Sequence, residues 1–178
     1  TMKGVNKVLQ YLLSTQDFKL TGMYAPKTDS FDYYSDSDHA GDMPITTHSH
    51  TGTVLIMNNV PIQWRSKKQP KTSRSSAEAE IYALSDTLAD ARLLGWKMKD
   101  ININIPDKII IKVDNNQAKA FANDECVNSK LRTAFSLKEA WVKEIKDKDE
   151  VQVIQIPADI NVSDMLTKVQ SGTKVKRY

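Results

Sequence analysis

The sequence predicts a single α/β domain built on a mixed β-sheet. Three extended segments come first, at residues 31–37, 51–57 and 60–65, and alternating helical and extended patterns follow them. Consecutive strands of a meander pair antiparallel, whereas a strand that returns after a helix pairs parallel. With 178 residues, 40% hydrophobic and 26% charged, the chain has the length and balance of one compact domain. We therefore expect a sheet that is antiparallel at one side, parallel at the other and flanked by helices.

Hydrophobic periodicity places the individual elements. The pair Asn58-Asn59 joins the second and third strands, because Asn tolerates the positive φ of a tight hairpin turn. A helical pattern covers residues 75–98, and the β-branched segment Ile109–Val113 predicts a buried strand. The remaining expected elements are helices at 116–122 and 130–146, a strand at 150–156 and a helix at 161–168.

The two ends of the chain differ from this domain. Apolar residues near the start recur at helical spacing and predict a short amphipathic helix that ends near Ser14: Val5, Val8, Leu9, Leu12 and Leu13. Residues 18–24 are interpreted as a strand and residues 26–30 as a linker. We therefore divide the chain into residues 1–30, a domain over residues 31–168, and a basic tail over residues 169–178.

Composition limits the possible partners and compartment. No segment approaches the ~20 apolar residues of a membrane-spanning helix, and the opening residues show no signal-peptide pattern, so no membrane partner is expected. Cys126 is the only cysteine, which excludes an internal disulfide and fits a reducing, intracellular location. The net charge of +3 is modest.

Three acidic residues stand where elements of the predicted sheet begin or end. Asp36 lies at the end of the first strand, Asp114 directly follows a buried strand, and Asp164 lies in the last helix. Each has an ordinary structural alternative: a turn for Asp36, a helix N-cap for Asp114 and a capping box for Asp164. Functional groups gather at the carboxyl ends of parallel strands, so we also expect these acids to converge there.

The helical pattern at residues 75–98 carries two further acids, and the face of the helix distinguishes them. Its apolar stripe, which must face the sheet, consists of Ala77, Ile81, Leu84, Leu88 and Ala91. At about 100° per residue, Glu80 falls roughly 60° from the centre of that stripe, and Glu78 falls about 100° away on the other side. Glu78 fits a surface partner of the helix dipole. Glu80 is aimed at the interior, where a carboxylate needs a cation.

Together, four carboxylates predict a divalent-metal site. Such groups cannot share a small volume at neutral pH without raised pKa values or bound cations. Hard ions such as Mg²⁺ prefer oxygen ligands, and two of them about 3.5–4 Å apart would activate a water and stabilise the departing oxygen of a phosphodiester. No Ser/His/Asp or Cys/His arrangement competes, because the three histidines all lie between residues 39 and 50.

A basic segment, residues 65–74, lies between the third strand and the long helix. It contains five cations and no acid: Arg65, Lys67, Lys68, Lys71 and Arg74. Two interpretations remain open, a solvated loop or contacts with nucleic-acid phosphates. His48 and His50 lack a nearby third ligand, so an exposed loop is preferred to a metal site there. Trp64 is interpreted as core or hairpin packing.

These motifs resemble the ribonuclease H domain of copia-type retrotransposon polyproteins. Residues 34–42, YSDSDHAGD, look like its first acidic motif, and residues 62–70 look like its third strand and basic loop. The strongest match is residues 73–84, SRSSAEAEIYAL, and residues 113–118 and 158–168 complete the series in the expected order. Residues 5–20 look like the end of the connection segment that joins such a domain to its reverse transcriptase.

The resemblance implies an α/β, ribonuclease H-like fold with strands in the order 3-2-1-4-5. It implies cleavage of the RNA strand of RNA/DNA hybrids during reverse transcription, with two Mg²⁺ ions for which Mn²⁺ can substitute. The implied partners are the hybrid and the reverse transcriptase domain of the same polyprotein. A monomeric isolated domain is expected, located in a cytoplasmic virus-like particle or in the nucleus. The implied metal ligands and catalytic residues are Asp36, Glu80, Asp114 and Asp164. The predicted substrate-binding residues are Arg65, Lys67, Lys68, Lys71, Arg74, Ser76 and Asn115.

Two features depart from the family pattern. Cellular ribonucleases H carry a histidine in the loop before the last acid, whereas residues 157–161 contain none, which predicts slower proton transfer or product release. Many copia-type sequences have two histidines in the helix corresponding to Arg132–Glu144, and both are missing here. Their loss puts substrate contacts by that helix in question.

Two other functions remain open. An integrase or transposase of the same fold would join DNA strands with a carboxylate triad and would assign no role to Asp164. A catalytically weak or inactive nucleic-acid-binding module would keep the fold without the chemistry. Retention of all four acids argues against such a module, because a scaffold does not need carboxylates that repel one another.

Overall fold

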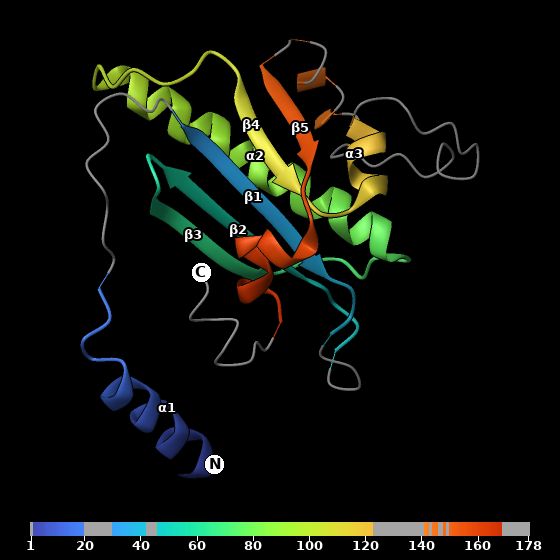
Figure 1. The fold of residues 1–178 in the computed structure, drawn as a ribbon. Helices are drawn as coiled ribbons and strands as arrows, with labels where there is room; N and C mark the ends of the chain where they lie inside the picture. Colours follow the sequence, from blue (N-terminus) through green and yellow to red (C-terminus); the bar gives the residue numbers. More distant parts are fainter. Residues whose placement is uncertain are drawn as a thin grey trace.

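The structure, a computed structural model, describes residues 2–19, 30–41, 46–122, 141–142, 144–145, 148 and 150–168. Its centre is a five-stranded sheet in the order β3-β2-β1-β4-β5 (Figure 1). The strands are β1 (Phe31–Asp38), β2 (His50–Met57), β3 (Val60–Lys68), β4 (Ile109–Val113) and β5 (Val151–Gln155). The β1-β2 and β2-β3 pairs are antiparallel, and the β1-β4 and β4-β5 pairs are parallel. The predicted mixed sheet and its strand order are confirmed.

The turn between β2 and β3 forms as the sequence predicts. Asn58 and Asn59 both have positive φ, 51° and 64°, which suits a two-residue hairpin. β3 continues further than predicted, because Lys67 and Lys68 pair with the first residues of β2. Three cations of the basic segment, Arg65, Lys67 and Lys68, therefore belong to a strand and not to a loop.

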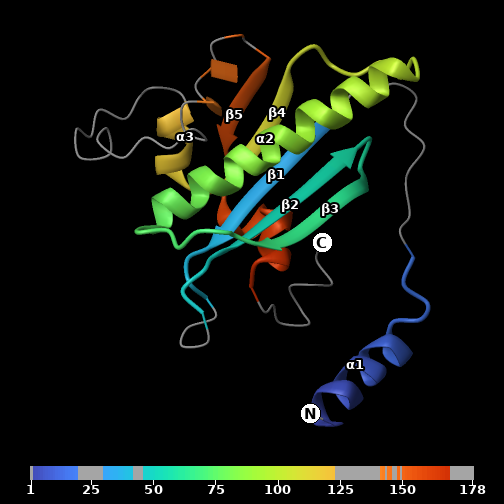
Figure 2. The same ribbon diagram turned by 180° about the vertical axis from the view of Figure 1, so that it is seen from behind.

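Helix α2 (Ser76–Asp100) covers one face of the sheet (Figure 2). It begins after Ser75, whose hydroxyl accepts a hydrogen bond from the backbone N–H of Glu78. All five residues of the predicted apolar stripe are buried. They pack with Tyr33, Leu55 and Ile111 of the strands, so that the hydrophobic core lies between α2 and the sheet.

The last predicted helix, residues 161–168, forms in part, as the short 3-10 helix η3 (Val162–Leu166) and not as an α-helix. A second 3-10 helix, η2 (Ala158–Ile160), precedes it. Asn161 between them is extended, with φ −76° and ψ 99°, and caps η3 by accepting from the backbone N–H of Ser163; its buried side chain also donates to the carbonyl of Ser35 on β1. η3 lies against the sheet on the side away from α2 (Figure 1). Asn161 thus ties this segment to the central strand.

The other predicted helices are described in part. α3 (Asn116–Ala122) forms as expected, and the described residues of the predicted helix at 130–146, namely 141–142 and 144–145, are helical. The first helix, α1 (Met2–Ser14), buries none of its residues and lies apart from the sheet in both views (Figures 1 and 2). Most of the predicted strand at 18–24 and linker at 26–30 lies outside the described residues, as does the whole tail. Within the described part of the chain, no helix has the length and apolar character needed to cross a membrane.

Candidate metal centre

Three of the predicted acids meet where β1 and β4 diverge. Parallel pairing of these strands ends at Tyr34 and Lys112, two residues before Asp36 and Asp114 respectively. Asp36, still within β1, and Asp114, directly after β4, therefore lie at the same level of the sheet. Glu80 reaches them from the first turns of α2. One carboxylate oxygen from each of the three acids lies within 4.8 Å of the others. The structure therefore brings together three acids that are far apart in sequence.

Burial gives this cluster unusual electrostatics. Asp36 and Glu80 are only 1% and 7% exposed. Loss of hydration raises the pKa of Asp36 to about 6, although Thr167 and Lys168 oppose the rise. Loss of hydration, together with the charges of Asp36 and Asp114, raises the pKa of Glu80 to about 8. A metal-free site therefore keeps a proton on Glu80 near neutral pH, and on Asp36 only in mildly acidic solution.

Two buried oxygens of the cluster show what it can bind. Among the described residues, Oδ1 of Asp36 and Oε2 of Glu80 have no hydrogen-bond partner. Unpartnered buried acceptors are costly and rare in folded proteins. A divalent cation that prefers oxygen ligands would satisfy both atoms and neutralise the mutual repulsion of the acids. The donor set therefore fits Mg²⁺ or Mn²⁺.

The fourth acid, Asp164, approaches from η3. It is 6% exposed, and its Oδ1 accepts a hydrogen bond from Nζ of Lys168 at 2.8 Å. The same Nζ lies 3.7 Å from Oδ2 of Asp36, and the hydroxyl of Thr167 donates to that oxygen. Asp164 thus lies next to the three-acid cluster and is connected to it through Lys168 and Thr167.

A close approach of η3 to the sheet holds Asp164 in place. Gly52 of β2 pairs with Asp36, and a Cβ atom at Gly52 would come within 2.7 Å of both the carbonyl of Ser163 and Cγ2 of Thr167. The position therefore requires glycine for steric reasons. The hydroxyl of Ser66 on β3 also donates to the carbonyl of Leu166 at 2.6 Å. Neither contact was anticipated from the sequence.

Sequence reasoning missed four residues of this site: Gly52, Asn161, Thr167 and Lys168. One signal for the last two was available. Thr167 and Lys168 follow Asp164 by three and four residues, which places all three side chains on one face of a helical turn. Gly52 and Asn161 carry no such local signal, because their roles depend on strands distant in sequence.

The structural alternatives for two acids are resolved by their neighbours. The side chain of Asn115, not Asp114, caps α3 by accepting from the backbone N–H of Ala118 at 3.3 Å. Glu78 accepts from the backbone N–H of Arg74 at 2.6 Å and from the hydroxyl of Tyr82 at 3.1 Å. Glu78 is therefore a surface residue of the helix start, as predicted.

The predicted substrate-binding residues fall into two groups. Five of them are exposed near the start of α2: Lys67, Lys68, Lys71, Arg74 and Ser76. The other two already have partners within the protein, since Arg65 pairs with Asp90 of α2 at 2.7 Å and Asn115 caps α3. The exposed group leaves its cations available for phosphates.

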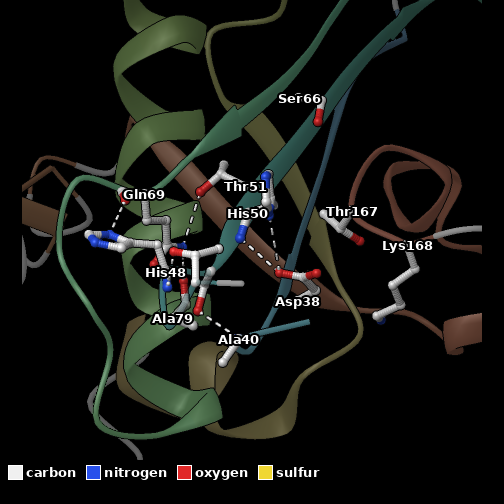
Figure 3. A network of polar contacts seen from close by, with 12 residues as sticks. Asp38, Ala40, His48, His50, Thr51, Ser66, Gln69, Ala79, Thr167 and Lys168 are labelled. Atoms are coloured by element: carbon white, nitrogen blue, oxygen red, sulfur yellow. Dashed lines mark hydrogen bonds and ion pairs between the residues drawn. The ribbon is translucent and has the colours of Figure 1, made fainter. Parts of the chain in front are cut away.

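Gln69 anchors the basic segment beside the site. It is 3% exposed, and its Nε2 donates to the hydroxyl of Thr51 at 3.1 Å and to the carbonyl of Ala79 at 2.9 Å (Figure 3). Its own carbonyl contacts Nδ1 of His48 at 2.8 Å. Ala79 directly precedes Glu80. Gln69 therefore contacts both the basic segment and the helical turn that carries Glu80.

Of two predictions about neighbouring residues, the one for the histidines is wrong and the one for Trp64 holds in its hairpin alternative. His48 and His50 are half-buried and do not lie in an exposed loop: His48 contacts Gln69, and the backbone N–H of His50 donates to Oδ1 of Asp38 at 2.8 Å (Figure 3). Trp64 is 56% exposed and is not part of the core. It lies on the edge strand β3 and pairs across the hairpin with Val54 of β2, so the hairpin alternative holds.

Comparison with known proteins gives relatives of one kind over most of the chain. No family model matches. The chain is 27% identical over 177 residues to a retrovirus-related Pol polyprotein from transposon RE2 of Arabidopsis thaliana, a match that covers 98% of the chain and 12% of that protein. It is 26% identical over 141 residues to the corresponding polyprotein from transposon TNT 1-94 of Nicotiana tabacum, covering 79% of the chain and 10% of that protein. It is 38% identical over 89 residues to secreted RxLR effector protein 161 of Plasmopara viticola, covering 50% of the chain and 61% of that protein.

Solved structures share the fold at low sequence identity. LC11-RNase H1, isolated from compost by a metagenomic approach, superposes with a TM-score of 0.59 at 18% identity, covering 79% of this chain and 94% of that chain. The same enzyme in complex with an RNA/DNA hybrid superposes with a TM-score of 0.58 at 17% identity, covering 78% and 94%.

Topology and superposition define the class: this chain has the ribonuclease H fold, a five-stranded sheet in the order 3-2-1-4-5. Within that class, sequence similarity relates it to the Pol polyproteins of retrotransposons, and the resemblance seen in its motifs is confirmed. The chain spans only 12% of the RE2 polyprotein.

Proposed function

We propose that this chain is a ribonuclease H that hydrolyses the RNA strand of RNA/DNA hybrids during reverse transcription. The observation that carries the proposal is the buried cluster of Asp36, Glu80 and Asp114, with two carboxylate oxygens that lack a hydrogen-bond partner. Two further observations support the proposal. The cluster lies in a ribonuclease H fold, and the relatives of the chain are Pol polyproteins.

Two Mg²⁺ ions, or Mn²⁺ in their place, fit the acids as follows. Asp36, Glu80 and Asp114 would hold one ion, and Asp36 with Asp164 would hold the other, so that Asp36 contributes to both. Such ions supply an activated water and a stabilised leaving oxygen for in-line phosphodiester cleavage. The chain's own part is to fix the acids: η3 presses on Gly52, and Thr167 donates to Asp36.

The exposed cations supply the substrate contacts in this proposal. Lys67, Lys68, Lys71 and Arg74 lie on the segment that Gln69 anchors next to Glu80. Proteins recognise a hybrid through its shape, sugars and phosphates, so sequence preference should be weak. Ser76 at the start of α2 is a further candidate contact. Arg65 and Asn115 have structural partners and would act on substrate only indirectly.

The biological setting belongs to the same proposal. The domain would work next to the reverse transcriptase of its own polyprotein, as a monomer when isolated, in a cytoplasmic particle or in the nucleus. The length of the relatives, of which the matched region is a small share, is consistent with a partner domain on the same polypeptide.

The test uses three labelled duplexes of one sequence: an RNA/DNA hybrid, an RNA duplex and a DNA duplex. The chain should cut only the RNA strand of the hybrid, only with Mg²⁺ or Mn²⁺, and EDTA should stop it. Cleavage or joining of the DNA duplex would favour an integrase-like function. Binding of the hybrid with no cleavage at any metal concentration would identify an inactive binding module and contradict the proposal.

A further inference from the structure

Lys168 places a cation between two acids of the proposed metal site. Its Nζ lies 2.8 Å from Oδ1 of Asp164 and 3.7 Å from Oδ2 of Asp36. In the proposed function these two acids share one of the two divalent ions. We propose that the Lys168 ammonium is a built-in counter-ion that occupies the place of this ion in the metal-free chain and must be displaced before the ion binds.

The ion pairs of the cluster are distributed unequally. Both Asp164 and Asp36 have Lys168 within 4 Å, and Thr167 adds a hydrogen bond to Asp36. Within the described part of the chain, by contrast, no lysine or arginine forms an ion pair with Glu80 or Asp114. A divalent ion held by Asp36, Glu80 and Asp114 therefore meets an ion-paired lysine at one of its three ligands, whereas one held by Asp36 and Asp164 meets that lysine at both of its ligands.

The position of Lys168 allows it to leave. Its side chain is 48% exposed, while the two carboxylates it contacts are 1% and 9% exposed. A lysine ammonium sits on a flexible four-carbon stem and can turn into water without repacking the interior. The carboxylates remain fixed when it does so, because Asn161 and Thr167 hold their backbone segments.

Unequal binding of the two ions follows. The ion at Asp36, Glu80 and Asp114 binds first, and the ion at Asp36 and Asp164 binds at higher metal concentration, because its binding free energy includes the loss of the lysine contacts. Lys168 thereby sets the metal concentration at which the site becomes complete. This inference rests on the proposed function, since it assumes that the acids bind divalent ions.

A matched pair of variants separates this role from a general effect of charge. Lys168→Gln removes the ammonium from the site. Lys148→Gln is the control, because Lys148 also pairs with an acid four residues before it, Glu144, at 2.7 Å and with a similar side-chain exposure of 51%. Isothermal titration of Mn²⁺, and separately of Mg²⁺, into the full metal-free chain without nucleic acid measures both ions directly.

We expect two affinities in the parent chain and in Lys148→Gln. In Lys168→Gln the weaker affinity should rise about tenfold or more, because the ion no longer has to displace the ammonium from Asp36 and Asp164. The stronger affinity should change less. Thermal unfolding provides a second readout. Without metal, Lys168→Gln should have a lower melting temperature than the parent, and added Mn²⁺ should raise its melting temperature more than it raises that of the parent.

The outcomes are distinguishable. An unchanged weaker affinity in Lys168→Gln, or the same rise in Lys148→Gln, overturns the role of Lys168 and leaves the proposed function in place. If neither the parent nor Lys168→Gln binds any ion, both the inference and the metal chemistry of the proposed function are overturned.

Discussion

Replacing Glu80 by Gln should stabilise the metal-free protein at pH 8 and abolish cleavage of the hybrid. Glu80 is 7% exposed and faces Asp36 and Asp114. The amide of Gln keeps the size of the side chain and carries no charge at any pH. The substitution therefore removes a buried carboxyl group whose resistance to ionisation costs stability at high pH, together with a proposed metal ligand that the reaction needs.

The pKa of Glu80 sets the size of the stability effect. Burial and neighbouring charges raise that pKa from 4.5 to about 8. The folded chain then binds a proton that the unfolded chain has lost, so the free energy of unfolding falls as the pH rises between these two values. At about 1.4 kcal/mol per pH unit over about 3.5 units, the loss in the parent has an upper limit of about 5 kcal/mol. Burial likewise raises the pKa of Asp36 from 3.8 to about 6, which adds a loss of the same sign at lower pH.

Urea unfolding in EDTA at pH 4.5, 6 and 8, followed by circular dichroism, measures this effect. The free energy of unfolding of Glu80→Gln should equal that of the parent at pH 4.5 and exceed it by about 1 to 5 kcal/mol at pH 8. Glu78→Gln is the control: it weakens the start of α2, costs about 0.3–1 kcal/mol, and leaves cleavage nearly unchanged. The reasoning is refuted if Glu80→Gln gains nothing at pH 8, or if Glu78→Gln is the variant that loses cleavage.

Three further predictions test the surroundings of the cluster. Gly52→Ala should push η3 away from β2, lower stability by about 1–3 kcal/mol, and reduce cleavage by displacing Asp164; an unaltered melting temperature would show that η3 does not press on this position. Changing Lys67 and Lys68 together to Ala should weaken hybrid binding for all sequences alike and flatten its salt dependence by about one unit of log–log slope per lost contact, measured with a cleavage-defective parent. Equal salt slopes for the parent and the double variant would show that the basic segment is a solvated surface and does not contact phosphates. Added Mn²⁺ should raise the melting temperature of the parent more at pH 8 than at pH 5, because metal ligands bind in their deprotonated form; equal shifts at both values would contradict the metal assignment.

Much of the fold could be predicted from the sequence, because the hydrophobic pattern of each segment matches the face that the segment buries in the folded domain. The apolar stripe of α2 and the β-branched strand β4 each bury the face that periodicity indicates. The same stripe distinguished the buried Glu80 from the surface Glu78. The strand order came from the resemblance, whereas the hairpin and crossover connections predicted only the mixed pairing, and the sheet confirms both.

The segment around Asp164 could not be predicted, because its conformation depends on contacts distant in sequence. Asn161 donates to the carbonyl of Ser35, and a hydrogen bond across 126 positions leaves no local pattern in the sequence. The steric need for Gly52 likewise appears only when η3 is in place. Lys168 ends the predicted helix, and nothing in the sequence around it indicates that Asp36 lies beside it.

The central claim is that the acids at the divergence of β1 and β4 hold the metals that cut RNA, and Asp114→Asn tests it most directly. The measurement is the rate of RNA-strand cleavage in a labelled hybrid with saturating Mg²⁺, for the parent and for Asp114→Asn at equal hybrid occupancy. Asp114→Asn should remain folded, be as stable as the parent or slightly more so in EDTA, and cleave at least about a hundredfold more slowly, because loss of a metal ligand costs more than loss of its supporting contacts. Cleavage within a few-fold of the parent rate would contradict the account.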